Sequence, residues 1–286
     1  MNRRTTVLHF CLCLMLFSAG CANKYTERSL AVRPAAESIV VVPGYAEQAI
    51  DATGGLEGWF EAKKLQMEAV VTLYRADGST YLTEHRYEVY PWSNSIRVTT
   101  REPMGTFSWL MSRGQLVEEQ APDANVPSGP LNGNVTPEDF AELVLDVSTA
   151  GVRFLDGAAV FEVLEEPVKI DTQWYYAITR LPTLQEGPVL ANVTFYQNLN
   201  SRVVDAVEAP VEMGAGFYLA RAYNYEKARA GAMLLPTKIE IFRTDALRVS
   251  RRRLVTLDFT KLAALSEVDT YSDNRIIRWF EQRLGR

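Results

Sequence analysis

The sequence predicts an α+β protein built on one large, curled antiparallel sheet, an open half-barrel of about 10–12 strands packed on a few α-helices. Between residues 65 and 259, most segments alternate apolar and polar residues with a period of two, as half-buried strands do. Only a few residues join many of these segments, which is typical of antiparallel meanders. Helices do not alternate with strands, and this excludes a doubly wound parallel sheet. So large a sheet must twist or curl, and curling around helices produces a half-barrel.

Residues 1–20 have the layout of a secretory signal peptide. Arg3 and Arg4 precede an apolar run from Val7 to Phe17, which is shorter than the roughly 20 residues that a membrane-spanning helix needs. The next residues, Ser18-Ala19-Gly20-Cys21, resemble the lipobox of bacterial lipoproteins, although Ser18 stands where that family usually has Leu. The resemblance implies that Cys21 is lipidated and becomes the mature N-terminus. The alternative is an ordinary cleaved signal followed by a chance cysteine.

The composition of residues 21–286 excludes several classes of function. Without the two arginines of the signal, 28 basic residues face 35 acidic ones, so the net charge is −7 (28 − 35). A net acidic chain argues against general nucleic-acid binding. Cys21 is the one cysteine left and His85 the one histidine, so neither a disulfide within the domain nor a thiolate metal site is expected. We predict no metal and no cofactor apart from the covalent lipid on Cys21.

Residues 21–45 are expected to form the lipidated N-terminus and a tether, because charged and small residues are mixed there with Pro34 and Pro43, although Ser38-Ile39-Val40-Val41-Val42 could add a short strand. The folded domain is then expected to span residues 46–286. It opens with a helical segment, Ala46 to Ala62, which is interrupted by glycines at positions 54, 55 and 58.

The first half of the sheet is predicted from strict alternation. Odd-numbered residues from Leu65 to Leu73 are apolar, and the turn Ala76-Asp77-Gly78-Ser79 leads into a return strand. Five strands are expected here: residues 65–73, 80–90, 95–100, 106–111 and 115–119.

The clearest helix of the chain follows a loop rich in proline, glycine and asparagine. Thr136 suits the N-cap, Pro137 the first helical position, and Glu138 and Asp139 the positive end of the helix dipole. Four apolar residues then recur at i, i+3, i+4 and i+7, which predicts one buried face ending before Gly151. They are Phe140, Leu143, Val144 and Val147.

The strand period returns after this helix. Seven further strands are expected, at residues 160–164, 173–180, 191–197, 202–208, 217–224, 237–244 and 252–259. A final amphipathic helix is predicted from about Asp273 to Leu284, with Ile276, Ile277 and Phe280 facing inward.

Three short stretches resemble the LolA/LolB-like superfamily of bacterial lipoprotein-sorting proteins. They are Ala52-Thr53-Gly54-Gly55-Leu56-Glu57-Gly58-Trp59 before the first strand, the strand–turn–strand from Val193 to Glu208, and Leu235-Pro236-Thr237-Lys238-Ile239-Glu240-Ile241. The resemblance covers residues 46–259. It implies a concave sheet covered by helices and an apolar cavity for acyl chains, and it supplies no catalytic residues.

An aromatic and methionine-rich group is the candidate wall of such a cavity, because methionine and aromatic side chains form an adaptable apolar surface. The alternative is that these side chains simply fill the core. The candidate ligand-binding residues are Met104, Phe107, Trp109, Met111 and Trp174.

A dense basic cluster near the C-terminus is the candidate site for lipid headgroups. Arg248, Arg251 and Arg253, with Arg252 between them, could hold phosphate groups or touch an anionic membrane. The alternative is a solvated loop and a strand edge protected by charge.

The sequence does not support enzyme chemistry. His85 has no partner motif, and adjacent carboxylates such as Glu118 and Glu119 or Glu165 and Glu166 point to opposite faces of a strand. No nucleophile elbow, phosphate-binding loop or dinucleotide motif is present.

We therefore predict a non-catalytic envelope lipoprotein that binds or transfers a lipid or a lipoprotein acyl chain in an apolar cavity. The alternative is a scaffold lipoprotein with a solid core and a protein partner in the envelope. A hydrolase would require carboxylates that only the fold brings together. The expected partners are the membrane, through the lipid on Cys21, a lipid ligand and an envelope protein, but no nucleic acid.

Ala22 determines the expected location. By resemblance to lipoprotein sorting signals, Asp at this position retains a lipoprotein in the inner membrane. Ala22 therefore predicts an anchor in the outer membrane with the domain facing the periplasm.

Overall fold

The computed structural model describes residues 43–103, 105–121, 131, 135–155, 159–181, 192–211, 216–248 and 251–266. All of them belong to one compact unit, residues 39–286. The predicted signal, Cys21, Met104 and the predicted helix at residues 273–284 lie outside the described residues.

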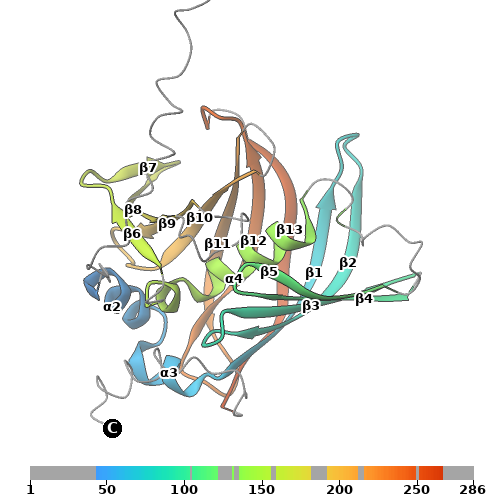
Figure 1. The fold of residues 1–286 in the computed structure, drawn as a ribbon, viewed down its shortest axis with the longest axis horizontal. Helices are drawn as coiled ribbons and strands as arrows, with labels where there is room; N and C mark the ends of the chain where they lie inside the picture. The colour runs from blue at the N-terminus through green and yellow to red at the C-terminus, as the bar shows by residue number, and fades with distance from the viewer. Residues whose placement is uncertain are drawn as a thin grey trace, which may run out of the picture. The chain divides into compact units, whose positions relative to one another are not determined.

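Thirteen strands form a single antiparallel sheet that does not close into a barrel (Figure 1). The strand order is β5-β4-β3-β2-β1-β13-β12-β11-β10-β9-β8-β6, and β7 pairs with β8. This confirms the predicted fold class, with one strand more than expected. The strands are β1 (Lys64–Tyr74), β2 (Thr80–Tyr90), β3 (Ser95–Glu102), β4 (Gly105–Ser112), β5 (Gln115–Gln120), β6 (Val160–Val163), β7 (Val168–Ile170), β8 (Gln173–Leu181), β9 (Val193–Asn198), β10 (Val204–Pro210), β11 (Phe217–Lys227), β12 (Leu234–Thr244) and β13 (Arg251–Leu265).

The strands that come first and last along the chain, β1 and β13, lie side by side near the middle of the sheet. β1 pairs with β2 on one edge and with β13 on the other, so that Thr72 stands opposite Thr256. A bulge between Glu68 and Ala69 interrupts the β1–β13 register. Bulges bend strands and increase their local twist, so this one adds to the curl of the sheet at the β1–β13 pair.

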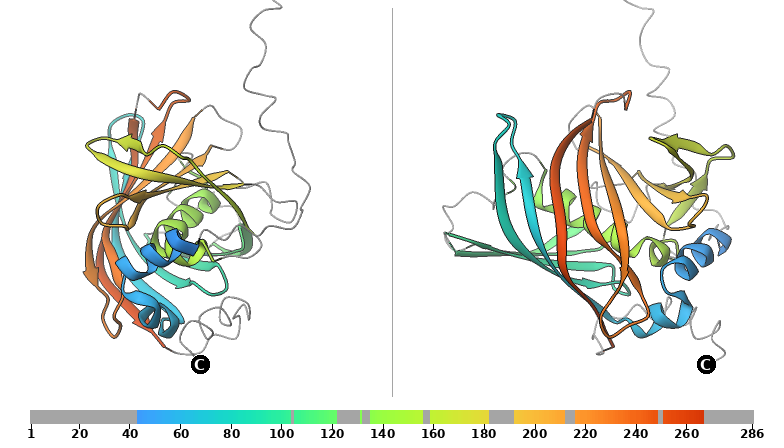
Figure 2. Two further views of the ribbon diagram at one scale, coloured as in Figure 1. Left: turned by 90° about the vertical axis from the view of Figure 1, so that its left-hand side faces the viewer. Right: turned by 180° about the vertical axis from the view of Figure 1, so that it is seen from behind.

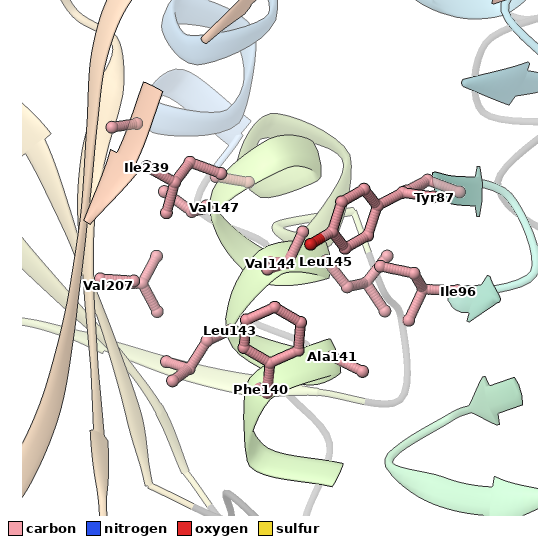
Figure 3. Close-up of a cluster of buried hydrophobic side chains, with 14 of the residues drawn as sticks. Tyr87, Ile96, Phe140, Ala141, Leu143, Val144, Leu145, Val147, Val207 and Ile239 are labelled. Atoms are coloured by element: carbon pink, nitrogen blue, oxygen red, sulfur yellow. The ribbon is translucent and has the colours of Figure 1, made fainter. Parts of the chain in front are cut away.

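Helix α4 (Pro137–Arg153) lies in the hollow of the curled sheet (Figure 2). It begins as predicted: the Thr136 hydroxyl oxygen accepts a hydrogen bond from the Asp139 amide at 3.0 Å, and Pro137 occupies the first turn. Its side chains reach both limbs of the sheet, with Tyr87 and Ile96 on one side and Val207 and Ile239 on the other (Figure 3).

The burial of α4 differs from the expectation of one buried face. Every residue from Asp139 to Arg153 is buried, including Glu142, Asp146 and Arg153. The guanidinium of Arg153 compensates both carboxylates, at 2.6 Å from Asp146 and 3.0 Å from Glu142. The sheet wraps the helix from two sides and a further helix packs against it, so the polar stripe is enclosed as well.

The predicted helical segment at residues 46–62 is in fact two helices, α2 (Pro43–Ala52) and α3 (Gly55–Glu61). Gly54 separates them with φ 123°, and a Cβ placed there would lie 2.7 Å from the Met233 Cα. The Thr53 carbonyl accepts the Leu234 amide at 3.0 Å. Gly54, which has no side chain, thus allows the junction between α2 and α3 to pack directly against Met233 and Leu234 at the start of β12.

Strand β7 was not predicted, because three residues are too few to show a period. It accompanies a second, smaller apolar cluster separate from the core around α4. The buried members of this cluster are Ile170, Tyr175, Ala177, Tyr196, Ala206 and Leu219.

Candidate functional site

An aromatic cluster lies between α4 and the inner face of strands β2 and β4. It consists of His85, Tyr87, Trp109 and Phe140, all buried. The His85 ring centroid lies 5.7 Å from that of Phe140 and 6.4 Å from that of Trp109, in edge-on geometry. Such edge-to-face contacts are favourable for aromatic rings. We refer to these four residues as the inner aromatic cluster.

Three polar atoms in or beside this cluster have no hydrogen-bond partner among the residues that the structure describes. They are His85 Nε2, Trp109 Nε1 and Thr100 Oγ1, on residues that are only 2%, 3% and 0% exposed. Thr100 stands directly opposite His85 in the β2–β3 register, so their side chains lie close together on one face. Most buried polar atoms in proteins are hydrogen-bonded, which makes this group unusual.

The cluster is uncharged at neutral pH. Burial lowers the pKa of the His85 imidazole from 6.5 to about 3, and burial raises the pKa of the Tyr87 phenol well above its usual range. The His85 Nδ1 and the Tyr87 hydroxyl lie 2.9 Å apart and form a hydrogen bond.

A narrow crevice with about 10 Å³ of free space lies beside Trp109, one residue of this cluster. Phe107 and Trp109 of β4 line it together with Glu119 and Gln120 of β5 and Pro137 of α4. Its volume is that of about one water molecule. The crevice is thus far too small for an acyl chain while α4 occupies the hollow.

The structure brings three of the five candidate cavity residues together. Phe107, Trp109 and Met111 alternate on the inner face of β4, and all three are buried in the core around α4. Trp174 of β8 lies elsewhere: it is 51% exposed, and the Lys169 Nζ lies 5.9 Å from its ring centre. Met104 lies outside the described residues.

Each arginine of the candidate headgroup site is bound to a different carboxylate. The guanidinium of Arg248 lies 2.7 Å from Glu208, that of Arg251 2.8 Å from Asp171, and that of Arg253 3.4 Å from Glu240. The arginines therefore do not converge on one pocket of positive charge.

The sequence predicts a structural role for His85 and indicates no role for Thr100. A signal for Thr100 was available, because it continues the inward alternation of Ile96 and Val98 with a polar residue.

Among the described residues, no group of histidine, cysteine or acidic side chains could hold a metal ion. None of the described helices is long and apolar enough to cross a membrane.

The fold defines a class of protein: an open antiparallel half-barrel that holds a helix in its hollow. A LolA superfamily protein from Nitrosomonas europaea has a similar structure, with 18% sequence identity and a TM-score of 0.53, covering 79% of this chain and 94% of that one. The chain therefore has a LolA-like fold, as its short motifs suggested.

Two other solved structures align with lower TM-scores. A DUF1329 family protein from Desulfovibrio piger is 10% identical with a TM-score of 0.46, covering 82% of this chain and 98% of that one. A domain assigned to outer-membrane lipoprotein sorting, from Vibrio parahaemolyticus, is 13% identical with a TM-score of 0.41, covering 84% and 98%. No family model and no curated protein matches the sequence.

Proposed function

We propose that this protein is a non-catalytic envelope lipoprotein that binds or transfers an acyl chain in the hollow of its sheet. The observation that supports this most directly is the large cluster of apolar side chains that the sheet buries around α4 (Figure 3). The crevice beside Trp109 cannot admit an acyl chain, so a chain that enters the hollow there must displace part of α4. Each methylene of the acyl chain that moves from water into the hollow contributes roughly 0.8 kcal/mol of transfer free energy.

Native mass spectrometry of the Cys21→Ser domain, exported to the periplasm and purified without detergent, tests this proposal. We expect a reproducible mass excess that extracts as lipid and identifies the cargo. A clean apo mass, with no uptake of added fatty acid or phospholipid, would contradict it.

Two tryptophans provide a matched pair of probes for where the chain binds. Trp109 faces the hollow and Trp174 is half exposed outside it. A brominated fatty acid should quench part of the fluorescence of the Trp174→Phe variant, and less of that of the Trp109→Phe variant. Equal quenching in both variants would argue against binding in the hollow.

The alternative function is a scaffold lipoprotein that meets a protein partner. The close packing of α4 against both limbs of the sheet favours it, because a solid core needs no ligand. A clean apo mass in the experiment above would favour this alternative.

We further propose that the lipid on Cys21 and the tether over residues 21–45 hold the domain, residues 46–286, at the outer membrane. Metabolic labelling with palmitate should mark the wild type and not Cys21→Ser. Substitution Ala22→Asp should move the protein to the inner-membrane fraction. Finding the wild type already in that fraction would contradict the proposed location.

Contact of Arg248, Arg251 and Arg253 with anionic headgroups remains a proposal. Phosphate would have to replace Glu208, Asp171 and Glu240 as their partners. Replacing all three arginines by Gln should weaken salt-sensitive binding to phosphatidylglycerol vesicles, whereas the control Arg97→Gln should not. Unchanged vesicle binding in the triple variant would exclude this role.

A further inference from the structure

Three polar side chains are held without partners where an apolar core would be expected. His85 Nε2, Thr100 Oγ1 and Trp109 Nε1 belong to three adjacent strands, β2, β3 and β4, and all project to the side of the sheet that α4 covers. Leaving such groups unpaired in a dry interior costs stability, and an apolar residue of the same shape would avoid the cost. The arrangement therefore suits a partner that the chain itself does not provide.

The hydrogen-bonding capacity of the three groups defines that partner. The indole of Trp109 can only donate, and the hydroxyl of Thr100 can donate. When the Tyr87 hydroxyl donates to His85 Nδ1, His85 carries its proton on Nε2 and donates there as well. Three donors thus lie on adjacent strands around the His85 and Trp109 rings, whose centroids are 6.4 Å apart, and an acceptor oxygen placed among them would pair with them.

The surroundings favour a neutral acceptor. Burial alone lowers the pKa of His85 and raises that of Tyr87, with no charged side chain among the causes that would compensate a phosphate or a carboxylate there. A buried anion without a counter-charge is strongly disfavoured.

We propose that His85, Thr100 and Trp109 form a binding site for the ester carbonyl oxygen of a glycerolipid whose acyl chain occupies the hollow. This inference rests on the proposed function and specifies which part of the ligand is recognised. The crevice beside Trp109, which residues of β4, β5 and the start of α4 line, is where the ester group would approach the site.

A pair of probes separates ester recognition from chain binding. Monopalmitoylglycerol has the ester carbonyl, and hexadecylglycerol ether has a chain of the same length without it. Isothermal titration of the Cys21→Ser domain should show about tenfold tighter binding of the ester, the effect of one well-made hydrogen bond. In Thr100→Val the ester affinity should fall to that of the ether, while the ether affinity stays within about twofold. Trp109→Phe should weaken binding of the ester more than binding of the ether.

The matched control is Thr256→Val. Thr256 is also a buried sheet threonine, but it is hydrogen-bonded to the Tyr74 hydroxyl, away from the cluster. This variant should keep the preference for the ester. The indole N–H resonance of Trp109 in a ¹H–¹⁵N spectrum should move downfield with the ester and not with the ether.

The outcomes distinguish the two proposals. Equal affinity of the wild type for ester and ether would overturn the carbonyl site, leaving the three groups to a bound water, while acyl-chain binding itself would stand. Absence of binding for both probes would overturn the proposed function and this inference with it.

Discussion

His85 illustrates how a single residue can make the stability of this fold depend on pH. Its imidazole is enclosed by Tyr87, Trp109 and Phe140 and hydrogen-bonded to the Tyr87 hydroxyl. Desolvation in this surrounding disfavours the imidazolium, so the pKa of His85 falls from 6.5 to about 3 on folding.

We predict that the folded state loses stability as the pH falls from 7 toward 3. Between these limits the unfolded chain binds a proton on His85 and the folded chain does not, so acid favours unfolding. At pH 5 the loss from this group is about 2 kcal/mol relative to pH 7.5. Urea titrations at both pH values check this, and His85→Phe should show a smaller pH dependence. An equal dependence in the variant would contradict the buried neutral imidazole.

Removing the hydroxyl of Thr100 should not reduce the stability of the fold. Because its hydroxyl is buried without a partner in the described structure, Thr100→Val should leave the free energy of unfolding unchanged or raise it by about 1 kcal/mol. The same substitution at Thr256, whose hydroxyl bonds Tyr74, should lower it. Loss of stability in Thr100→Val would show that the hydroxyl has a partner after all.

At the scale of elements, the junction of α2 and α3 depends on Gly54. Its φ of 123° and the 2.7 Å approach of a Cβ to Met233 leave no room for a side chain. We predict that Gly54→Ala destabilises the domain by roughly 2 kcal/mol or more.

Gly44→Ala is the matched control. Gly44 belongs to α2, and a Cβ added there meets no atom within 4 Å. This substitution should be neutral or slightly stabilising, because alanine favours helix. Thermal melts of both variants check the pair, and equal losses would mean that the junction tolerates a side chain.

Helix α4 depends on Arg153 to compensate its buried acidic side chains. In Arg153→Met, Asp146 and Glu142 lose this guanidinium, and we expect a loss of about 3–5 kcal/mol. Arg97→Met breaks the partly exposed pair with Glu118 and should cost about 1 kcal/mol or less. Denaturant unfolding measures both. Similar small losses would mean that Arg153 is dispensable.

Most of these elements could be predicted from the sequence because their periodicity is long. β1 and β2 each have eleven residues of alternation, and α4 has a cap, a proline and four spaced apolar residues. β7 has three residues, which is too few for a pattern. The meeting of His85, Thr100 and Trp109 depends on the register of β2, β3 and β4 and on α4 above them, which no local pattern contains.

For the whole molecule, stability should be graded from the middle of the sheet to its edges. β1, β12 and β13 are paired on both sides, whereas β5 is an edge strand that is mostly exposed. We predict that amides of β1 and β13 exchange most slowly with deuterium and that those of β5 exchange early. Hydrogen exchange read by mass spectrometry checks this order. Early exchange across the β1–β13 pair would contradict it.

The pairing of β1 with β13 also governs when this protein can become folded. Thr72 and Thr256 face each other across that seam, so a growing chain must reach residues 251–265 before the central pair can form. Folding cannot simply follow the order of synthesis, because residues 64–74 lack one of their two neighbours until residues 251–265 emerge. A nascent chain would therefore expose one edge of β1 throughout its production, and a chaperone that covers extended apolar segments would find its natural target there.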